Sequence, residues 1–258
     1  MRSKAVRWRT SMQIVTAGLV LREVKIGEAD RILTILTPEH GILSASAKGS
    51  LRLKSKLFSA CGLFCYSEFT LFAGKKIYQV NEAQVKKVFF GLHESVEGMA
   101  LAMYLSEFAM TLSPTGPEAE VQLRLLLNSL YLISEGKKPL AQIKAVYEWR
   151  AICESGYMPD LLCCKSCHKY DGGNFYFDGS AGVLLCEECA ARQGKKPNLD
   201  PPALLALRHI ALVDDKKIFS FSIPPQSLTL LGQVTERYAL RMLDKPLKTL
   251  DFLKTMLS

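Results

Sequence analysis

The spacing of apolar residues changes near residue 90, and this change limits the chain to a fold with two different parts. Before it, short runs rich in β-branched and aromatic residues alternate with polar ones, as expected of half-buried strands. After it, apolar residues recur every three or four positions, which is the spacing of a helix with one buried face. The chain is therefore predicted to be a multidomain α+β protein, with a β part followed by a helical part.

The first part is expected to contain five strands, separated by turn residues such as those of Pro38–Gly41. Five short strands in about 75 residues favour a small closed barrel. The five-stranded barrel that binds oligonucleotides is the OB-fold, and we predict this fold for residues 12–90. The expected strands are Thr16–Val24, Arg31–Thr37, Ile42–Lys48, Tyr66–Phe72 and Ile77–Val85.

The second part, residues 91–258, is predicted to be an all-α helical bundle with one insert. Within it, Glu118–Ser134 is apolar nearly all round, so we expect it to be the central helix. No apolar run reaches the roughly 18–20 residues that span a bilayer, so no membrane contact is expected. The other helices are expected at 96–112, 139–154, 203–213 and 226–243, and in a short last segment that ends at Leu257.

Two Cys-x-x-Cys pairs with eighteen residues between them are the most specific local pattern in the chain. The segment between the pairs is typical of a β-hairpin. Four thiolates satisfy the tetrahedral preference of Zn²⁺ and leave no open position, so such a site is structural. Cys163 or His168 is an alternative to one of the ligands. We predict a zinc ribbon insert over residues 159–198, in which one Zn²⁺ is held by Cys164, Cys167, Cys186 and Cys189.

Positive charge is concentrated at the start of the chain. Residues 1–90 carry fifteen Lys and Arg against six Asp and Glu, whereas the remaining residues carry eighteen against nineteen. This split favours a surface that binds nucleic acid or another polyanion, although a solvated Lys-rich surface is the plain alternative. Four of the cations lie in the acid-free stretch Lys48–Lys56, directly after the third expected strand.

Contacts to the nucleic-acid backbone are expected from this basic stretch and from other exposed cations of the barrel. Lys and Arg that neutralise phosphates give an affinity that falls steeply with salt and depends little on base sequence. Phe69, Phe72 and Tyr78 are candidates to stack on bases, although strand alternation places about half of such aromatics in the core. The predicted contacts are Arg22, Lys48, Arg52, Lys54, Lys56, Lys75 and Lys76.

The first eleven residues are basic and follow no structural pattern. We interpret residues 1–11 as a disordered extension, or as sequence upstream of a true start at Met12. The apolar run that follows, Ile14–Leu21, is short and interrupted, so it does not predict a signal peptide. A reducing cytoplasm is therefore the expected location, where cysteines serve more often as metal ligands or buried thiols than in disulfides.

The familiar signatures of catalysis are missing from the sequence. It contains no P-loop, no Gly-x-Gly-x-x-Gly and no His-Glu-x-x-His motif, and its four histidines lie far apart along the chain. Cys61 and Cys65 have no histidine nearby in sequence that would activate a nucleophile. The chain is therefore not expected to be an enzyme.

Several N-terminal motifs resemble those of one family, the bacterial recombination mediator RecO. The likeness continues through the helical part and the cysteine insert, so it covers nearly the whole chain after Met12. The sequence departs from the family at Ser50–Lys54, where the family usually carries a more arginine-rich run. The motifs that carry the resemblance are Gly18–Arg22, Gly27–Ile32, Thr37–Gly41 and Ala47–Gly49.

The resemblance implies a non-enzymatic mediator that binds single- and double-stranded DNA through an OB-fold and anneals complementary strands. It also implies that the protein works with RecR to load RecA onto DNA coated by single-strand-binding protein (SSB). In this family the acidic, apolar C-terminal tail of SSB docks on the helical domain, RecA and RecF are indirect partners, and the protein lies in the cytoplasm at the nucleoid. From the residues alone, an RNA-binding OB-fold and zinc-ribbon factor of translation or the ribosome stays open, as does a nuclease.

Overall fold

A computed structural model of the chain describes residues 13–257, which form two compact units. The first unit holds the residues up to Val88 together with Thr115–Glu120, and the second holds Phe89–Pro114 and the residues from Val121 onward. No helix in the described part of the chain is long and apolar enough to cross a membrane. The basic extension expected at residues 1–11 lies outside the described residues.

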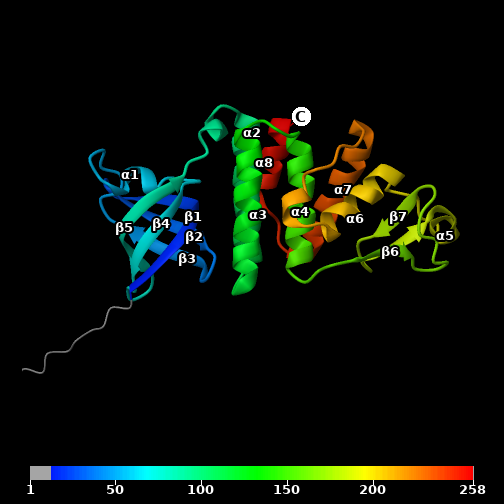
Figure 1. The fold of residues 1–258 in the computed structure, drawn as a ribbon, viewed down its shortest axis with the longest axis horizontal. Helices are drawn as coiled ribbons and strands as arrows, with labels where there is room; N and C mark the ends of the chain where they lie inside the picture. The colour runs from blue at the N-terminus through cyan, green and yellow to red at the C-terminus, as the bar shows by residue number, and fades with distance from the viewer. Residues whose placement is uncertain (1–12, 258) are drawn as a thin grey trace, which may run out of the picture. The chain divides into compact units, whose positions relative to one another are not determined.

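The first unit is built around a closed barrel of five strands (Figure 1). The strands are β1 (Gln13–Ile26), β2 (Asp30–Thr37), β3 (Gly41–Ala47), β4 (Tyr66–Phe72) and β5 (Tyr78–Lys87). Their order is β1-β2-β3-β5-β4, and only the pairing of β3 with β5 is parallel. The first half of β1 pairs with β4 and the second half with β2, and this double pairing closes the barrel. The five-stranded barrel that the sequence predicts is thus confirmed.

The barrel interior is filled by the apolar side chains of alternate strand positions. Leu33, Ile35 and Leu71 are fully buried there. Phe69 is also fully buried, so it is a core residue and is not available to stack on bases. Tyr78 packs against the core with part of its surface exposed. Alternation along the strands therefore separates core from surface as expected.

The second unit contains most of the helices, and its most buried helix is α4. In α4 the eight consecutive residues Gln142–Trp149 are all buried, whereas α3 keeps an exposed stripe that includes Arg124 and Tyr131. The expectation that residues 118–134 form the central helix is therefore wrong. The described helices outside the barrel and the insert are η1 (Phe90–His93), α2 (Val96–Leu112), α3 (Pro117–Ser134), α4 (Leu140–Glu154), α6 (Pro201–Leu212), η2 (Asp215–Lys217), α7 (Pro225–Leu243) and α8 (Lys248–Leu257), and the first turn of α3 belongs to the first unit.

Paired polar side chains explain how α4 can be buried on all sides. The carboxylate of Glu148 is fully buried, and it accepts hydrogen bonds from the Tyr104 hydroxyl at 2.6 Å and the Thr235 hydroxyl at 2.8 Å. The Lys144 ammonium lies 2.6 Å from Glu148 and 2.8 Å from Glu236. A buried charge is costly unless it is paired and hydrogen-bonded, and these contacts satisfy that condition. They join α4 to α2 and α7.

The cysteine insert forms a small sheet with one short helix. Its elements are β6 (Asp160–Cys164), β7 (Phe175–Asp178), β8 (Val183–Cys186) and α5 (Glu187–Arg192), and the strand order is β6-β8-β7. The expected hairpin is present as the antiparallel pair β7 and β8. The sheet packs against the helices through Trp149, Phe177 and Tyr238, whose ring centroids lie 5.2 to 5.5 Å apart. The insert is therefore packed onto the helices of the same unit.

Arg208 of α6 holds two segments of the insert through hydrogen bonds to their carbonyls. Its side chain is buried, and its guanidinium donates to the carbonyls of Leu161, Leu162 and Tyr170 at 2.8 to 2.9 Å. The same guanidinium lies 4.3 Å from the centroid of the Tyr170 ring. One side chain therefore holds both β6 and the segment that follows the first cysteine pair.

We expect Arg208→Ala to lower the free energy of unfolding of the second unit by about 3 kcal/mol, because it removes three charge-assisted hydrogen bonds and leaves carbonyls unpaired. The fluorescence of Trp149 reports this unit during urea unfolding, because its ring is buried against Phe177. Arg192→Ala, an exposed arginine of the same insert, is the control and should change stability by less than about 0.5 kcal/mol. Equal midpoints for the two variants would contradict this role of Arg208.

Candidate metal centre and nucleic-acid interface

Four cysteine sulfurs lie together at one end of the insert. Cys164 ends β6 and Cys186 ends β8, while Cys167 follows in a turn and Cys189 lies in α5. Their Sγ atoms are all within 4.8 Å of one another, and those of Cys167 and Cys186 are 3.5 Å apart. The structure thus brings together the four residues that the sequence singles out. They form a cluster that is able to bind a metal ion.

The chemistry of the cluster fits a cation bound by thiolates. Three of the four cysteines are buried, and only Cys167 is exposed. Burial raises the pKa of the Cys164 thiol, but hydrogen bonds from the backbone N–H groups of Cys186, Cys167 and Ser166 outweigh burial and lower that pKa below its ordinary value. Thiolates this close together repel one another unless a cation lies among them. The donor set therefore suits Zn²⁺ in a closed tetrahedral site.

The two alternative ligands lie outside this cluster. The Sγ atom of Cys163 is 3.8 Å from Nδ1 of His168, and neither residue belongs to the group of four. His168 has a φ of 60°, and its N–H donates to the carbonyl of Cys164 at 2.9 Å. His168 therefore serves to close the turn around the first cysteine pair, and this role needs no metal.

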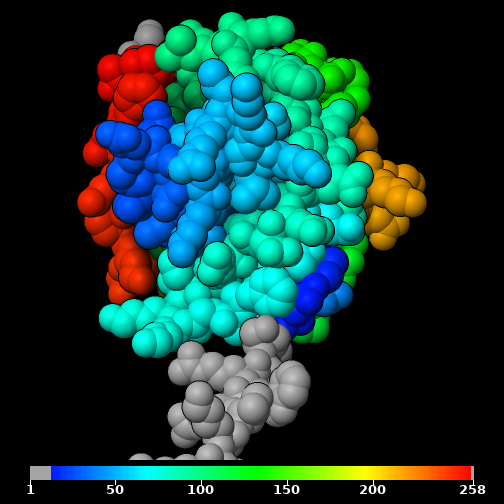
Figure 2. Space-filling model, turned by 90° about the vertical axis from the view of Figure 1, so that its left-hand side faces the viewer, coloured from blue at the N-terminus to red at the C-terminus, as the bar shows by residue number. Residues whose placement is uncertain are grey.

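The basic stretch Lys48–Lys56 forms the loop between β3 and the short helix α1 (Leu57–Ala60). The loop backbone is fastened to the turn between β1 and β2. The N–H of Gly49 donates to the Asp30 carboxylate at 2.7 Å, and the N–H of Leu51 donates to the carbonyl of Ala29 at 2.9 Å. Gly49 has a φ of 66°, a conformation that favours glycine. Figure 2 shows this segment, in light blue, near the centre of the face in view.

Arg31 fastens the far end of the basic loop, and its role was not predicted. Its side chain is buried, and its guanidinium donates to the carbonyl of Phe58 in α1 at 3.0 Å. The same guanidinium forms an ion pair with the Glu23 carboxylate at 3.3 Å. Arg31 therefore positions the loop and is not itself an open cation. Asp30 and Arg31 both lie in the motif Gly27–Ile32, but this motif does not indicate which atoms the Arg31 side chain contacts.

All seven predicted DNA contacts are exposed. Within residues 13–257, none of them forms an ion pair with a carboxylate. By contrast, the exposed Lys86 lies 2.8 Å from the Glu68 carboxylate. The structure groups Lys48, Arg52, Lys54 and Lys56 in one loop, whereas Arg22 lies in β1 and Lys75 and Lys76 lie in the separate β4–β5 loop.

Two family models together match nearly all of the chain. The model described as "Recombination protein O N terminal" matches residues 12–89, and the model described as "Recombination protein O C terminal" matches residues 93–251. The chain belongs to the RecO family. The predicted family is thus confirmed, and with it the expectation of a non-enzymatic recombination mediator. A RecO-family assignment also agrees with the barrel and the cysteine cluster described above.

Named relatives match this RecO-family chain along nearly their whole length. The "DNA repair protein RecO" of Acetivibrio thermocellus is 35% identical over 93% of this chain and 96% of the relative. The proteins of the same name from Dehalococcoides mccartyi (strain 195) and Alkaliphilus metalliredigens are 32% and 30% identical. These two matches cover 93% and 91% of this chain, and 95% of each relative. The similarity therefore extends over both units of the RecO-family chain.

Proposed function

We propose that this RecO-family protein binds single- and double-stranded DNA on its barrel and promotes annealing of complementary strands. The observation that carries this proposal is the loop Lys48–Lys56, whose exposed cations have no carboxylate partner among residues 13–257, on a barrel of the type that binds oligonucleotides. We propose that residues 12–90 act as the DNA-binding domain and that residues 91–258 carry the protein contacts. The proposed DNA contacts are Arg22, Lys48, Arg52, Lys54, Lys56, Lys75 and Lys76.

For two strands to anneal, the repulsion between their phosphate backbones must be reduced. The base edges must also stay free to pair. Lys and Arg side chains reduce the repulsion when they contact phosphates and displace counterions. The two hydroxyls of the loop are already engaged, since Ser50 donates to the carbonyl of Ala47 and Ser55 accepts from the N–H of Leu57. Few polar groups other than cations are therefore left in the loop, and binding should depend little on base sequence.

We propose further that Cys164, Cys167, Cys186 and Cys189 hold one structural Zn²⁺. When bound, the ion neutralises the thiolates and ties the end of β6 to the end of β8. Four sulfur ligands leave no position for a water or a substrate, so this ion does no chemistry. The exposed face of the insert would then keep its shape through the metal rather than through a large core of its own.

We propose RecR and SSB as direct partners, with RecA and RecF acting through them in the cytoplasm at the nucleoid. An acidic and apolar tail such as that of SSB needs an apolar groove with cations nearby. A groove of this kind runs along α6, where Leu205 and Leu212 are exposed beside Phe221. The Lys138 ammonium reaches the carbonyl of Phe221 at 3.5 Å, which places a cation at this groove.

Annealing of complementary DNA strands that are coated with SSB tests the proposed function. The protein should speed this reaction, and it should do so without cleaving either strand. The second candidate, an RNA-binding factor, predicts tighter binding to RNA oligomers than to DNA oligomers of equal length. A clear preference for RNA would contradict the proposed function.

A further inference from the structure

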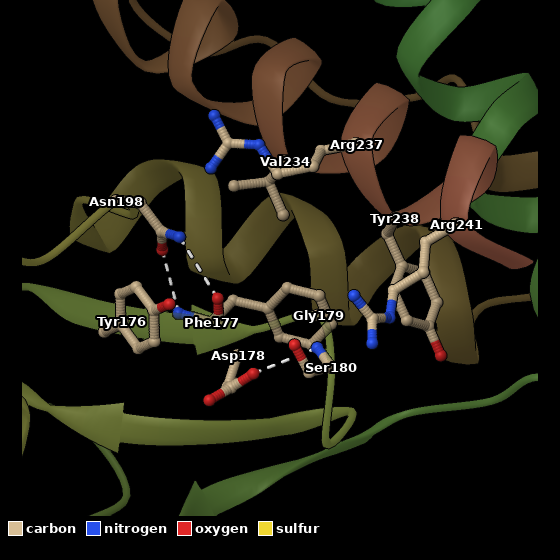
Figure 3. A pocket seen from close by; sticks show the side chains of 10 residues that line it. All are labelled: Tyr176, Phe177, Asp178, Gly179, Ser180, Asn198, Val234, Arg237, Tyr238 and Arg241. Atoms are coloured by element: carbon tan, nitrogen blue, oxygen red, sulfur yellow. Dashed lines mark hydrogen bonds between the residues drawn. The ribbon is translucent and has the colours of Figure 1, made fainter. Parts of the chain in front are cut away.

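A second cationic site lies in the other unit, where α7 faces the turn of the β7–β8 hairpin (Figure 3). A pocket of about 140 Å³ separates the two walls. One wall belongs to the helix and the other to the insert, so residues roughly sixty positions apart in the sequence line the same space. The lining of the pocket includes Phe177, Asp178, Asn198, Arg237, Tyr238 and Arg241.

The walls of this pocket are held in place by a ring contact between them and by hydrogen bonds within the insert. The rings of Phe177 and Tyr238 meet edge to face with their centroids 5.2 Å apart. The Asn198 side chain accepts from the N–H of Phe177 at 2.8 Å and donates to its carbonyl at 3.1 Å, as the dashed lines of Figure 3 show. The pocket is therefore formed before any ligand arrives.

Arg237 and Arg241 occupy successive turns of α7, and both are exposed. No carboxylate among the described residues forms an ion pair with either of them. The helix dipole favours a cation at Arg241, which lies in the last turn, but it gives no such benefit to Arg237. Like charges four residues apart slightly destabilise a helix. A bound anion would remove this repulsion.

Asp178 is the acidic residue among those that line the pocket, and its carboxylate is already engaged. It accepts a hydrogen bond from the Lys195 ammonium and another from the N–H of Ser180 at 2.9 Å. The hydrogen bond from Lys195 lowers the pKa of Asp178 and so keeps it ionised and paired. Asp178 therefore does not neutralise the two arginines, and the pocket keeps a net positive charge.

We propose that this pocket binds phosphate groups of single-stranded DNA through Arg237 and Arg241. The proposal rests on the proposed function, because nucleic acid is the polyanion that a DNA repair protein meets. Guanidinium groups form paired hydrogen bonds with phosphate oxygens. Figure 3 shows the two guanidinium groups at different ends of the pocket, so they contact neighbouring phosphates of one strand and not the same phosphate. The pocket is thus a DNA contact in a different unit from the basic loop.

The test measures binding of the full-length protein to a fluorescein-labelled 30-nucleotide oligo(dT) over a range of salt concentrations. In the double variant Arg237→Gln/Arg241→Gln, the affinity for the oligomer should fall about tenfold. The slope of the logarithm of the binding constant against the logarithm of the salt concentration (the salt slope) should fall by about 1.4, because two single-strand phosphate contacts are lost. The thermal midpoint should be unchanged or slightly higher, since removing a like-charge pair does not weaken α7. If the two arginines had a purely structural role, their substitution would instead lower the thermal midpoint and leave the salt slope unchanged.

Arg192→Gln with Lys216→Gln is the matched control, because both cations are exposed in the same unit but do not line the pocket. If the arginine variant bound oligo(dT) with the affinity and salt slope of the wild-type protein, this inference would be overturned. The proposal that the basic loop of the barrel binds DNA would still stand. The inference would also be overturned if the arginine variant bound DNA normally but no longer bound a labelled hexa-aspartate peptide. That result would show that the pocket binds an acidic protein segment. If the wild-type protein itself bound no oligo(dT), the proposed function would fall instead.

Discussion

Replacing Lys48, Arg52, Lys54 and Lys56 together by glutamate should abolish annealing of complementary DNA strands and weaken DNA binding at least about a hundredfold. Each lost phosphate contact lowers the salt slope for a single strand by about 0.7, so four lost contacts should lower it by nearly 3. The substituted side chains are exposed, and the hydrogen bonds of Gly49 and Leu51 that hold the loop come from the backbone. The fold and the zinc content should therefore remain intact. Fluorescence energy transfer between labelled naked strands measures the annealing rate.

A matched variant separates the effect of this loop from the effect of net charge. Substituting glutamate at four exposed cations of the second unit changes the net charge of the protein equally. This control should anneal at close to the wild-type rate. If the loop variant annealed as fast as the control, the basic loop would have no part in the mechanism. The control substitutions are Arg192→Glu, Lys196→Glu, Lys216→Glu and Lys245→Glu.

Cys186→Ser should remove the metal and unfold the insert, residues 159–198. The Cys186 side chain is buried at 1% exposure, and its sulfur lies 3.5 Å from that of Cys167. A serine oxygen neither reaches as far nor binds Zn²⁺ as well as a thiolate. Zinc binding to small domains of this kind supplies on the order of 10 kcal/mol towards folding. We expect the purified variant to lose one equivalent of zinc in a colorimetric assay and to become sensitive to protease within the insert.

Cys163→Ser is the control for this loss. Cys163 directly precedes Cys164 of the cluster, yet its sulfur contacts His168 and lies outside the cluster. This variant should keep its zinc and its resistance to protease. Retention of a full equivalent of zinc by Cys186→Ser would show that the four-sulfur site is not the metal centre.

The parts of the fold that the sequence predicts best depend on local patterns. Strand alternation and turn residues gave the five strands, and the cysteine spacing gave the cluster. The sequence predicts the wrong central helix because periodicity treats Lys144 and Glu148 as surface residues. Their burial is possible only because Tyr104, Thr235 and Glu236 reach them from other helices. No local pattern contains that information.

The candidate sites also divide into those that local sequence reveals and those that depend on long-range packing. The four cations of the basic loop are neighbours in sequence, so composition alone grouped them. Arg208 and Arg31 are cations as well, but each is buried against carbonyls from a distant segment, and nothing in their immediate sequence indicates this. The pocket between Asn198 and Arg237 likewise exists only after the insert packs onto α7. Long-range packing therefore determines which cations remain exposed to solvent.

We propose that this protein mediates DNA pairing on strands already covered by SSB, and annealing of such coated strands is the measurement to make. The wild-type protein should anneal both naked and coated strands rapidly. Leu212→Glu, in the groove along α6, should anneal naked strands normally but fail on coated ones. Phe90→Glu, at an equally exposed apolar residue with 76% exposure, should anneal both. Coated strands that anneal no faster with the wild-type protein than without it would contradict the proposed function.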